Sequence, residues 1–402
     1  MGNCGTTYGG LTGKTKEDFG HGNARFIPYT NVFDNPLTDT KRLGAVEIDS
    51  SQNQVAYGDA FFTVSSETPD EVGMSSVWLS DQEDVYLNSF CFGYRQDSTF
   101  DPHYLAYMLR SRSVRSNLTL LAQGISRFNI SKNKVMELSV PVPSAVEQEQ
   151  LGQYFTKLDS LITLHQRKHD KLCTLKKSML DKMFPKPGET EPEIRFEGFT
   201  DPWEQRKLGD CFEFLKNNTL SRADLNGENG TARNVHYGDI LIKFGDCLDG
   251  ERSDLPFITD DTVLPKFAGS ILREGDVIFA DTAEDEAAGK CVELRKLPKE
   301  PTISGLHTIP ARPRFPFGSG YLGHYLNSDA YHRQLLPLMQ GIKVISVSKA
   351  ALQDTQVRFP RLSEQAAIGA ALSEIDNLIT LHQRKLELLR NIKKSLLDRM
   401  FV

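Results

Sequence analysis

The residues that could carry catalysis are sparse in this chain. There is no Gly-x-x-x-x-Gly-Lys-Ser/Thr loop, so the usual backbone cradle for a nucleotide phosphate is missing. Gly20-His-Gly22 is a lone glycine pair, which indicates a turn. Glu293-Leu-Arg295 matches a nuclease carboxylate-plus-base pair only faintly, and solvated charge on a strand explains it better. We therefore predict that the chain itself is not an enzyme.

Metal chemistry also finds little support in the spacing of ligand-type residues. His165 and His382 stand at equivalent places, but no Cys, His or carboxylate lies opposite them at ligand spacing, so a polar layer between helices is favoured over a metal site. The cysteines form no C-x-x-C pair, which predicts free thiols and no zinc. The six are Cys4, Cys91, Cys173, Cys211, Cys247 and Cys291.

The elements that must position any functional side chain are two copies of one helix. Leu161-Ile-Thr-Leu-His-Gln-Arg-Lys168 recurs letter for letter as Leu378-Ile-Thr-Leu-His-Gln-Arg-Lys385, and 378 − 161 = 217 gives the offset of the repeat. Such a repeat must be interpreted before anything else. The same offset relates further pairs, namely Glu147-Gln148 with Glu364-Gln365, Lys176-Lys177-Ser178 with Lys393-Lys394-Ser395, and Met183-Phe184 with Met400-Phe401.

Both copies show a seven-residue period that predicts long amphipathic helices pairing through one seam. The expected seam residues are Leu151, Leu158, His165, Leu172 and Met179 in the first copy and Ile368, Ile375, His382, Leu389 and Leu396 in the second. A second row is expected three positions further on, at Tyr154, Leu161, Lys168 and Leu175, and at Ala371, Leu378, Lys385 and Ile392. The alternative is two surface helices that never meet.

The segments outside the helices also repeat, which predicts an α/β fold with two related domains. Ala24–Tyr29 matches Ala232–Tyr237, and Gln123-Gly-Ile125 matches Gln340-Gly-Ile342. Strands are expected over 24–33, broken at Pro28, over 57–64 and over 86–94, with a helix over 101–121. We predict domains at 1–143 and 201–360, spacer helices at 144–186 and 361–402, and a linker at 187–200.

Net charge and the distribution of apolar residues bear on the partners and the cellular location of the protein. The 402 residues carry a net charge of −6, which neither predicts nor excludes a nucleic-acid partner because the distribution of charge decides. The sequence contains no apolar run long enough to span a membrane and no signal-peptide pattern, which predicts a cytoplasmic protein that is not embedded in a membrane.

The layout resembles the specificity subunit of type I restriction–modification systems. The marks are Trp203-Glu-Gln-Arg-Lys-Leu-Gly209 at the start of the second domain, Pro141-Val-Pro143 before Glu147-Gln148, and the duplicated helix that ends in Lys-Lys-Ser…Met-Phe. The resemblance covers essentially the whole chain. It implies two target recognition domains that each read half of a gapped DNA site, joined by two antiparallel helices that form a coiled coil.

The resemblance also implies partners and cofactors. Two modification (methyltransferase) subunits and restriction (motor-nuclease) subunits would join this chain on double-stranded DNA. S-adenosylmethionine, ATP and magnesium would be bound by those partners, with no cofactor on this chain. Consistent with this, Asp34-Asn-Pro-Leu37 lacks the second proline and the aromatic residue of an adenine-methyltransferase loop.

DNA contacts are then expected from polar and basic residues in the variable domains, because phosphate contacts position a protein and base contacts specify sequence. In the first domain the candidates are Thr12, Lys14, Lys16, Arg25, Tyr29, Asn31, Ser65 and Arg127. In the second they are Lys216, Asn217, Asn218, Arg222, Arg233, Tyr237, Lys243 and Thr282. The shared Gln-Gly-Ile triplets are expected to be framework.

The two repeats differ at their starts. Gly2-Asn-Cys4 aligns with Gly209-Asp-Cys211, and the counterpart of Trp203–Leu208 is missing ahead of it. A shortened or silent specificity cassette is therefore an alternative, as is a standalone coiled-coil DNA-binding regulatory protein or a protein scaffold that binds no DNA.

Overall fold

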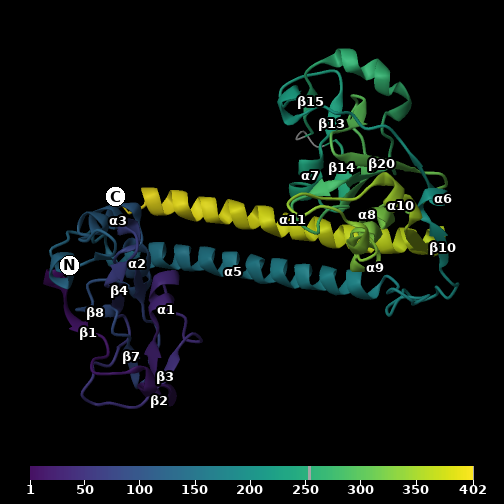
Figure 1. Ribbon diagram of the computed structural model, residues 1–402. Coiled ribbons are helices and arrows are strands. Elements are labelled where there is room, and N and C mark those ends of the chain that lie inside the picture. The colour runs from purple at the N-terminus through teal and green to yellow at the C-terminus, as the bar shows by residue number, and fades with distance from the viewer. Residues whose placement is uncertain (252–254, 402) are drawn as a thin grey trace. The chain divides into compact units, whose positions relative to one another are not determined.

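The computed structural model describes residues 1–251 and 255–401, which form two compact units (Figure 1). Unit 1 comprises Met1–Gln166 and Arg384–Val402, and unit 2 comprises Arg167–Gln383. Each boundary falls inside a 38-residue helix, either α5 (Ala145–Lys182) or α11 (Leu362–Arg399). Each unit therefore contains a domain and one part of both helices, and the predicted α/β class with two domains and two long helices is confirmed.

Unit 1 is built on a four-stranded sheet of order β1-β8-β4-β6, a three-stranded sheet of order β3-β2-β7 and the small pair β5-β9. The strands are β1 (Gly5–Gly9), β2 (Phe19–Ile27), β3 (Gly44–Val46), β4 (Ala60–Thr63), β5 (Ser65–Ser66), β6 (Ser75–Val77), β7 (Val85–Leu87), β8 (Cys91–Gln96) and β9 (Phe128–Asn129). The helices ahead of α5 are α1 (Tyr29–Asp34), α2 (Pro102–Met108), α3 (Arg112–Leu120) and α4 (Lys132–Met136), with short 3₁₀ turns at Gly2–Cys4, Lys16–Asp18 and Pro69–Glu71.

Unit 2 repeats this plan with larger sheets, of order β11-β20-β16-β18-β14 and β12-β15-β13-β19, and the pairs β17-β21 and β10-β22. The strands are β10 (Glu204–Lys207), β11 (Phe212–Phe214), β12 (Leu225–Asn226), β13 (Arg233–Val235), β14 (Cys247–Asp249), β15 (Phe257–Ile258), β16 (Val277–Ala280), β17 (Thr282–Ala283), β18 (Cys291–Lys296), β19 (Thr302–Ser304), β20 (Thr308–Pro313), β21 (Ile345–Ser346) and β22 (Gln356–Phe359). The helices are α6 (Leu208–Cys211), α7 (Tyr237–Ile242), α8 (Tyr321–Asn327), α9 (Asp329–His332) and α10 (Lys349–Asp354), with 3₁₀ segments at Arg222–Asp224, Asp261–Ser270 and Leu336–Leu338.

Each long helix is fixed to its own domain by the same duplicated residues. In unit 1 the Gln148 side chain accepts from Asp101 N at 2.8 Å and donates to Pro143 O at 3.0 Å. In unit 2 Gln365 makes the matching bonds, to Gly318 N at 2.9 Å and to Pro360 O at 2.8 Å. The glutamine of the repeated Glu-Gln dipeptide therefore satisfies backbone groups at the start of each helix.

Two glycines, one in each long helix, let the domains approach the helix backbone. A Cβ on Gly152 would lie 2.7 Å from Tyr104 N, and one on Gly369 would lie 2.3 Å from Ser319 O. Any side chain at either position would force the helix away from its domain. This close contact explains why glycine occupies the equivalent position in both helices, at Gly152 and Gly369.

Each unit has its own hydrophobic core, to which both long helices contribute. In unit 1, Phe155 of α5 and Phe401, just past α11, pack with ring centroids 5.4 Å apart, and both are almost fully buried. In unit 2, Phe184 packs edge-on against Tyr321 and Tyr325 of α8. The repeated Met-Phe ending of each helix thus closes a core against one domain.

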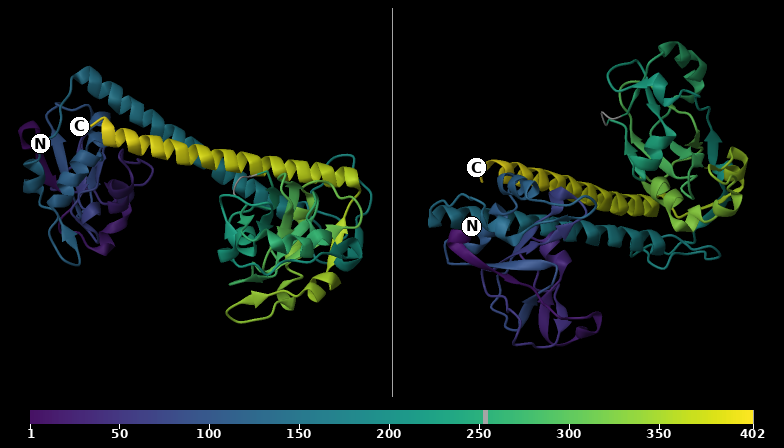
Figure 2. Two further views of the ribbon diagram at one scale, coloured as in Figure 1. Left: turned by 90° about the horizontal axis from the view of Figure 1, so that it is seen from above. Right: turned by 60° about the vertical axis from the view of Figure 1, so that its left-hand side comes forward.

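Within unit 1 the two helices run antiparallel, as the pairs Asp159–Lys393 (2.5 Å) and Gln166–Arg390 (3.0 Å) show (Figures 1 and 2). The first predicted row faces inward. The residues Leu151, Leu158, His165, Leu172, Met179, Ile368, Ile375, His382, Leu389 and Leu396 are all buried or half-buried.

The second predicted row is wrong for most of its members. Tyr154, Leu161 and Leu175 are each about 45% exposed, Lys168, Lys385 and Ile392 are exposed as well, and only Ala371 and Leu378 are half-buried. The residues four positions after the first row, among them Phe155, Ile162, Leu372 and Leu386, take the inner places instead. From each residue of the first row, the next inward-facing residue therefore lies four positions further on, and the next first-row residue follows three positions later. The predicted order was three positions and then four.

Local predictions for the first domain were correct only in part. Asp101 caps α2 as expected, accepting from Tyr104 N at 2.9 Å. The strand expected over 24–33 ends at Ile27, because the chain turns at Pro28 into helix α1. The strand expected over 86–94 is two strands, since Asn88 forms a side-chain turn that bonds Phe90 N.

All six cysteines are free thiols. Among the described residues no helix has the length and apolar character needed to cross a membrane.

Candidate nucleic-acid interface

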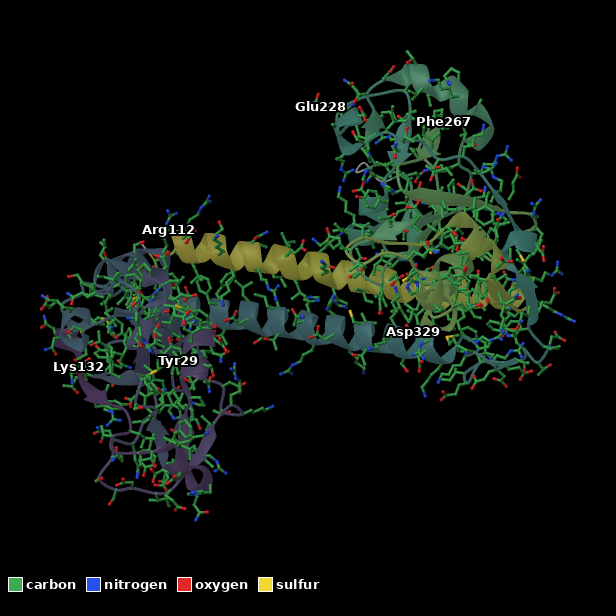
Figure 3. The ribbon with its side chains drawn as sticks, viewed as in Figure 1. Tyr29, Arg112, Lys132, Glu228, Phe267 and Asp329 are labelled. Carbon is green, nitrogen blue, oxygen red and sulfur yellow. The ribbon has the colours of Figure 1, made fainter. Side chains whose placement is uncertain are left out.

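Three of the predicted contact residues come together in unit 1 beside strand β9. Tyr29, labelled in Figure 3, is the first residue of α1, and its hydroxyl donates to Ser65 O at 2.8 Å. The exposed Arg127 guanidinium donates to Ser65 Oγ at 3.1 Å. These residues line an open groove of about 710 Å³ together with Thr30, Phe33, Ser66, Glu67, Glu71 and Ser126. The groove offers aromatic, hydroxyl, cationic and carboxylate groups on one surface.

Unit 2 builds a related surface from the same elements. Tyr237 is the first residue of α7, as Tyr29 is of α1, and Thr282 lies on β17, as Ser65 does on β5. The Tyr237 ring packs edge-on against His307 at 5.3 Å, His307 faces Asp281 at 3.4 Å, and Thr282 Oγ1 donates to Asp281. Tyr237 and Thr282 are thereby linked through His307 and Asp281, two residues that no local sequence pattern indicates.

A cationic cluster adjoins this surface in unit 2. Arg222 forms a two-pronged pair with the buried Asp239, at 2.7 and 2.6 Å, and Lys243 reaches the same carboxylate at 3.1 Å. Burial works against the charged carboxylate, but the hydrogen bonds from Arg222 and Lys243 hold the pKa of Asp239 below its usual value. Asp239 therefore stays ionised and fixes two half-exposed cations at the surface.

Other predicted contacts are used inside the protein, and for these the prediction was wrong. Asn31 is fully buried, and its amide binds the carbonyls of Asp39 and Arg42. Asn218 is 1% exposed and donates to Ser304 O at 2.8 Å. Such asparagines stabilise loops and cannot reach a DNA groove.

The remaining candidates divide between side chains that are already paired and side chains that are accessible. Arg233 stacks on Phe257 at 3.6 Å and donates to Leu255 O, which leaves its guanidinium largely buried. Lys14 pairs with Asp49 at 2.8 Å, and this hydrogen bond raises the pKa of Lys14. Accessible or half-accessible candidates away from the two clusters are Thr12, Lys16, Arg25, Lys216 and Asn217.

The shared Gln-Gly-Ile triplets form the tips of equivalent hairpins. Gln123 exchanges two backbone hydrogen bonds with Asn129, and Gln340 does the same with Ser346. Gly124 and Gly341 adopt positive φ, where a Cβ would lie about 2 Å from the carbonyl oxygen of Arg127 or Val344. Ile125 and Ile342 are each 97% exposed, so the shared triplets lie outside the hydrophobic cores. The turn projects an isoleucine outward in both units.

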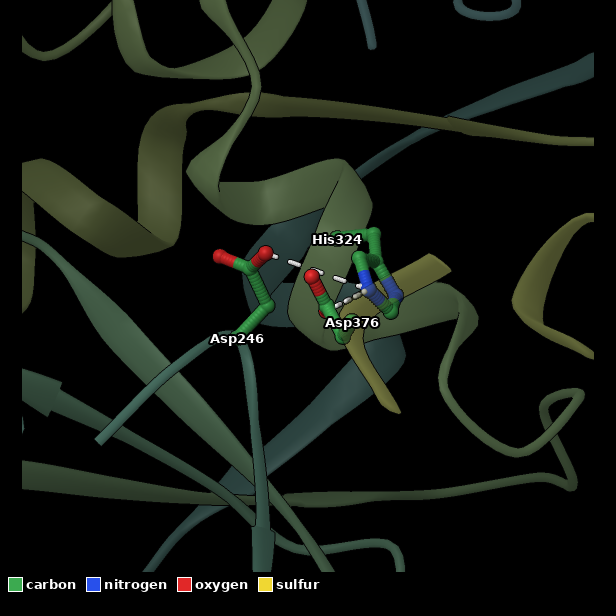
Figure 4. Close-up of side chains that lie close together, drawn as sticks. All are labelled: Asp246, His324 and Asp376. Carbon is green, nitrogen blue, oxygen red and sulfur yellow. Dashed lines mark hydrogen bonds and ion pairs between the residues drawn. The ribbon is translucent and has the colours of Figure 1, made fainter. Parts of the chain in front are cut away.

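A buried polar cluster in unit 2 contains groups that could bind a cation (Figure 4). His324 Nε2 lies 2.9 Å from Asp376, and Asp246 completes a set whose ligand atoms lie within 4.8 Å of one another. Lys176 Nζ, however, lies 2.6 Å from Asp246 and 2.5 Å from Asp376. The ammonium group is already paired with both carboxylates, so the arrangement is better explained as an ion-pair network that joins α5, α8 and α11 within unit 2.

Unit 1 contains a related arrangement, with one carboxylate and a different hydrogen-bonding partner for it. Lys393 Nζ lies 2.5 Å from Asp159, whose carboxylate accepts from the Tyr107 hydroxyl at 3.0 Å. Tyr107, Asp159 and Lys393 are the repeat counterparts of His324, Asp376 and Lys176. Because tyrosine replaces histidine in the repeat, this polar cluster is better explained as a structural joint than as a metal centre.

Comparison with known proteins agrees with this architecture. The family model described as the type I restriction modification DNA specificity domain matches residues 23–173. The type I restriction enzyme MjaVIII specificity subunit of Methanocaldococcus jannaschii is 23% identical over 76% of this chain and 70% of its own length. The putative MjaX specificity subunit of the same organism is 22% identical over 97% of this chain and 88% of its own length.

Among solved structures, the type I restriction–modification S subunit from M. genitalium shares the fold. It matches with a TM-score of 0.56 and 13% identity, covering 100% of this chain and 94% of that one. The family model thus covers the first domain and part of the first long helix, and the chain is similar to type I specificity subunits over most of its length.

Proposed function

We propose that this chain reads a bipartite, gapped DNA site, with each unit reading one half. The observation that carries the proposal is the duplicated surface. Both units place a tyrosine at the start of a short helix, a hydroxyl residue on a strand that pairs with one arm of a hairpin, and an exposed isoleucine at the hairpin tip. The charged groups around this shared frame differ, with Arg127 in unit 1 and Arg222 and Lys243 in unit 2. A constant frame with variable polar groups suits two readers of different bases.

The partners follow from the same proposal. Two modification subunits would bind this chain, and restriction subunits would join them for cleavage. S-adenosylmethionine, ATP and magnesium would then be held by those subunits. Because the two modification subunits are copies of one protein, they would contact residues that both units share, such as the repeated helix segments.

The experiment is co-expression with a modification subunit encoded beside this chain. The proposal expects a stable complex that binds and methylates one gapped DNA sequence, whereas this chain alone transfers no methyl group. Specific DNA binding without any modification subunit in the purified complex would favour a standalone regulatory protein. A complex that assembles but recognises no sequence would identify a silent cassette.

Arg127 supplies an exposed cationic group to the groove in unit 1. Arg127→Ala is expected to weaken binding by about 1–3 kcal/mol, the usual cost of losing one arginine–base contact, and to relax sequence preference in one half-site only. Binding of a randomised-site DNA library by the complex measures both effects. Arg112→Ala removes an exposed arginine on α3, outside the groove, and should leave the preference unchanged. Relaxed preference in both halves would refute the assignment.

The exposed isoleucines should contribute affinity without specificity, because both units share them. We expect them to make apolar contact with DNA, as wedge side chains do in minor-groove binders. Ile125→Ala with Ile342→Ala should reduce affinity by about 1–2 kcal/mol per site, with the preferred sequence and the salt dependence unchanged. Titration of labelled DNA at several salt concentrations tests this. Leu120→Ala, which alters an exposed leucine elsewhere in unit 1, is the control. Unchanged DNA affinity with loss of the modification subunit would show that the tips bind protein instead.

A further inference from the structure

A short turn connects the two main sheets of each unit, and its last residue carries an exposed ring. In unit 1, residues 88–90 join β7 to β8, and in unit 2, residues 305–307 join β19 to β20. The repeat offset relates the two turns residue for residue, since 307 − 217 = 90. The exposed ring belongs to Phe90 in unit 1 and to His307 in unit 2. One position therefore carries a ring in both units, apolar in the first and polar in the second.

His307 is held in an unusual backbone conformation. Its φ of 53° lies in the left-handed region, which residues other than glycine seldom adopt. Such a conformation costs free energy, and residues that adopt it cluster at sites of ligand contact. The His307 side chain is 48% exposed and Phe90 is 60% exposed, so neither ring offsets a backbone cost by filling a core.

Backbone hydrogen bonds place the turn of unit 1 next to the duplicated surface. Val64 N donates to Phe90 O at 3.0 Å, and Val64 O accepts from Ile130 N at 2.9 Å. Val64 directly precedes Ser65, and Ile130 directly follows the hairpin strand β9. The turn, the hydroxyl residue and the hairpin of unit 1 are thus fixed to one another through a single residue.

Unit 2 forms the same two bonds at the equivalent residues. Asp281 N donates to His307 O at 3.1 Å, and Asp281 O accepts from Val347 N at 2.8 Å. Asp281 directly precedes Thr282, and Val347 directly follows the hairpin strand β21. The ring at residue 90 or 307 therefore belongs to the frame that both units share.

The surroundings of the imidazole determine which of its nitrogens is available. His307 Nδ1 lies 3.4 Å from Asp281 Oδ1, and the ring packs edge-on against Tyr237. A proton on Nδ1 is favoured because this nitrogen faces the carboxylate. In the neutral ring Nε2, on the other side, is then a hydrogen-bond acceptor.

We propose that residues 90 and 307 are equivalent base-contacting positions, an inference that rests on the proposed function and assigns one contact to each half-site. His307 Nε2 accepts a hydrogen bond from the exocyclic amino group of an adenine or a cytosine in the major groove. Phe90 packs against the C5-methyl group of a thymine. A protein can place one element in the major groove and another in the adjacent minor groove, so these contacts are compatible with those of the isoleucine tips.

The first test measures binding of a randomised-site DNA library by the complex with the modification subunit. His307→Gly keeps the turn, because glycine adopts positive φ freely. It should weaken binding to the preferred site by about five- to tenfold and relax the preference at one base pair. Phe90→Ala should relax one A·T pair in the other half-site. Glu274→Gln, which alters an exposed residue at the far end of β16 from Thr282, should change neither preference.

Modified DNA then identifies the contacted groups. Deoxyuridine in place of thymidine at the pair that Phe90→Ala relaxes removes only the methyl group. It should weaken binding by the parent complex by about fourfold and leave binding by Phe90→Ala unchanged. At the pair that His307→Gly relaxes, purine in place of adenine or 2-pyrimidinone in place of cytosine removes the amino group. The parent should lose more affinity than His307→Gly does.

The outcomes separate this inference from the function on which it rests. If the parent complex selects a bipartite sequence and both variants keep every preference, the inference is wrong and the proposed function stands. Equal losses for parent and variant on the modified DNA would also overturn the assigned contacts. A parent complex that selects no sequence would refute both. Thermal melting of each variant should match that of the parent, and Phe90→Ala tests the position at a residue without positive φ.

Discussion

Replacing Lys176 with methionine is expected to destabilise unit 2 by about 3 kcal/mol. Removing one partner of a buried ion pair leaves the other charge without compensation, which costs about 3–5 kcal/mol. Here two carboxylates, Asp246 and Asp376, would be left facing each other next to the fully buried His324. The lower end of the range applies because Asp376 is about 31% exposed. Denaturant unfolding of the purified chain measures the loss.

The equivalent substitution in unit 1, Lys393→Met, should lower the free energy of unfolding by a smaller amount. Lys393→Met leaves one carboxylate, Asp159, which still accepts a hydrogen bond from Tyr107. The control for both variants is Lys177→Met, because Lys177 is an exposed neighbour on the same helix. Equal losses for Lys176→Met and Lys393→Met would contradict the idea that the second carboxylate makes the difference.

The effect of Lys176→Met should also depend on pH. Although burial opposes it, the hydrogen bond from His324 and the charge of Lys176 hold the pKa of Asp376 below its usual value. A depressed carboxyl pKa contributes stability above the unfolded pKa, and that stability disappears as the pH falls through the folded pKa. The gap in stability between the two proteins should therefore be full near pH 7 and shrink below about pH 4.

The order of domains and long helices could be predicted because the sequence contains it as an internal repeat. The constant offset of the repeat located the helices, the Glu-Gln pairs and the Met-Phe endings, and each of these has similar contacts in both units. The inner row of the seam followed from the seven-residue period. The second row did not, because a helical period of 3.6 leaves residues at both three and four positions as candidates. Packing against the partner helix and domain chooses between them, as Phe155 and Tyr154 show.

The candidate interface was predictable only in part, for a related reason. Tyr29, Ser65 and Arg127 are far apart in sequence, and their polar types alone selected them. The same criterion selected Asn31 and Asn218, which satisfy buried backbone groups. His307 and Asp281 join the surface through loop geometry that no local pattern reveals. Ile125 and Ile342 were interpreted as framework residues because both domains share them. The sequence does not show whether a shared residue is buried, and both of these side chains are exposed.

Exchanging residues 201–360 for the same segment of a related specificity subunit is expected to change one half of the recognised DNA sequence. The exchange replaces Arg222, Tyr237, Lys243 and Thr282 but leaves Tyr29, Ser65 and Arg127 untouched. It also retains both long helices and their Lys176 and Asp376 side chains. The donor should carry histidine or tyrosine at the position of His324, since the two units show that either can bond the aspartate.

Mapping methylated adenines across the genome of cells that express this exchanged chain, with its modification subunit, tests the two-reader account most directly. The parent chain provides the reference map. The account predicts that one half-site changes completely to that of the donor, while the other half-site keeps every base. A map in which both half-sites change, or in which neither does while methylation persists, would contradict the claim that each unit reads one half of the site.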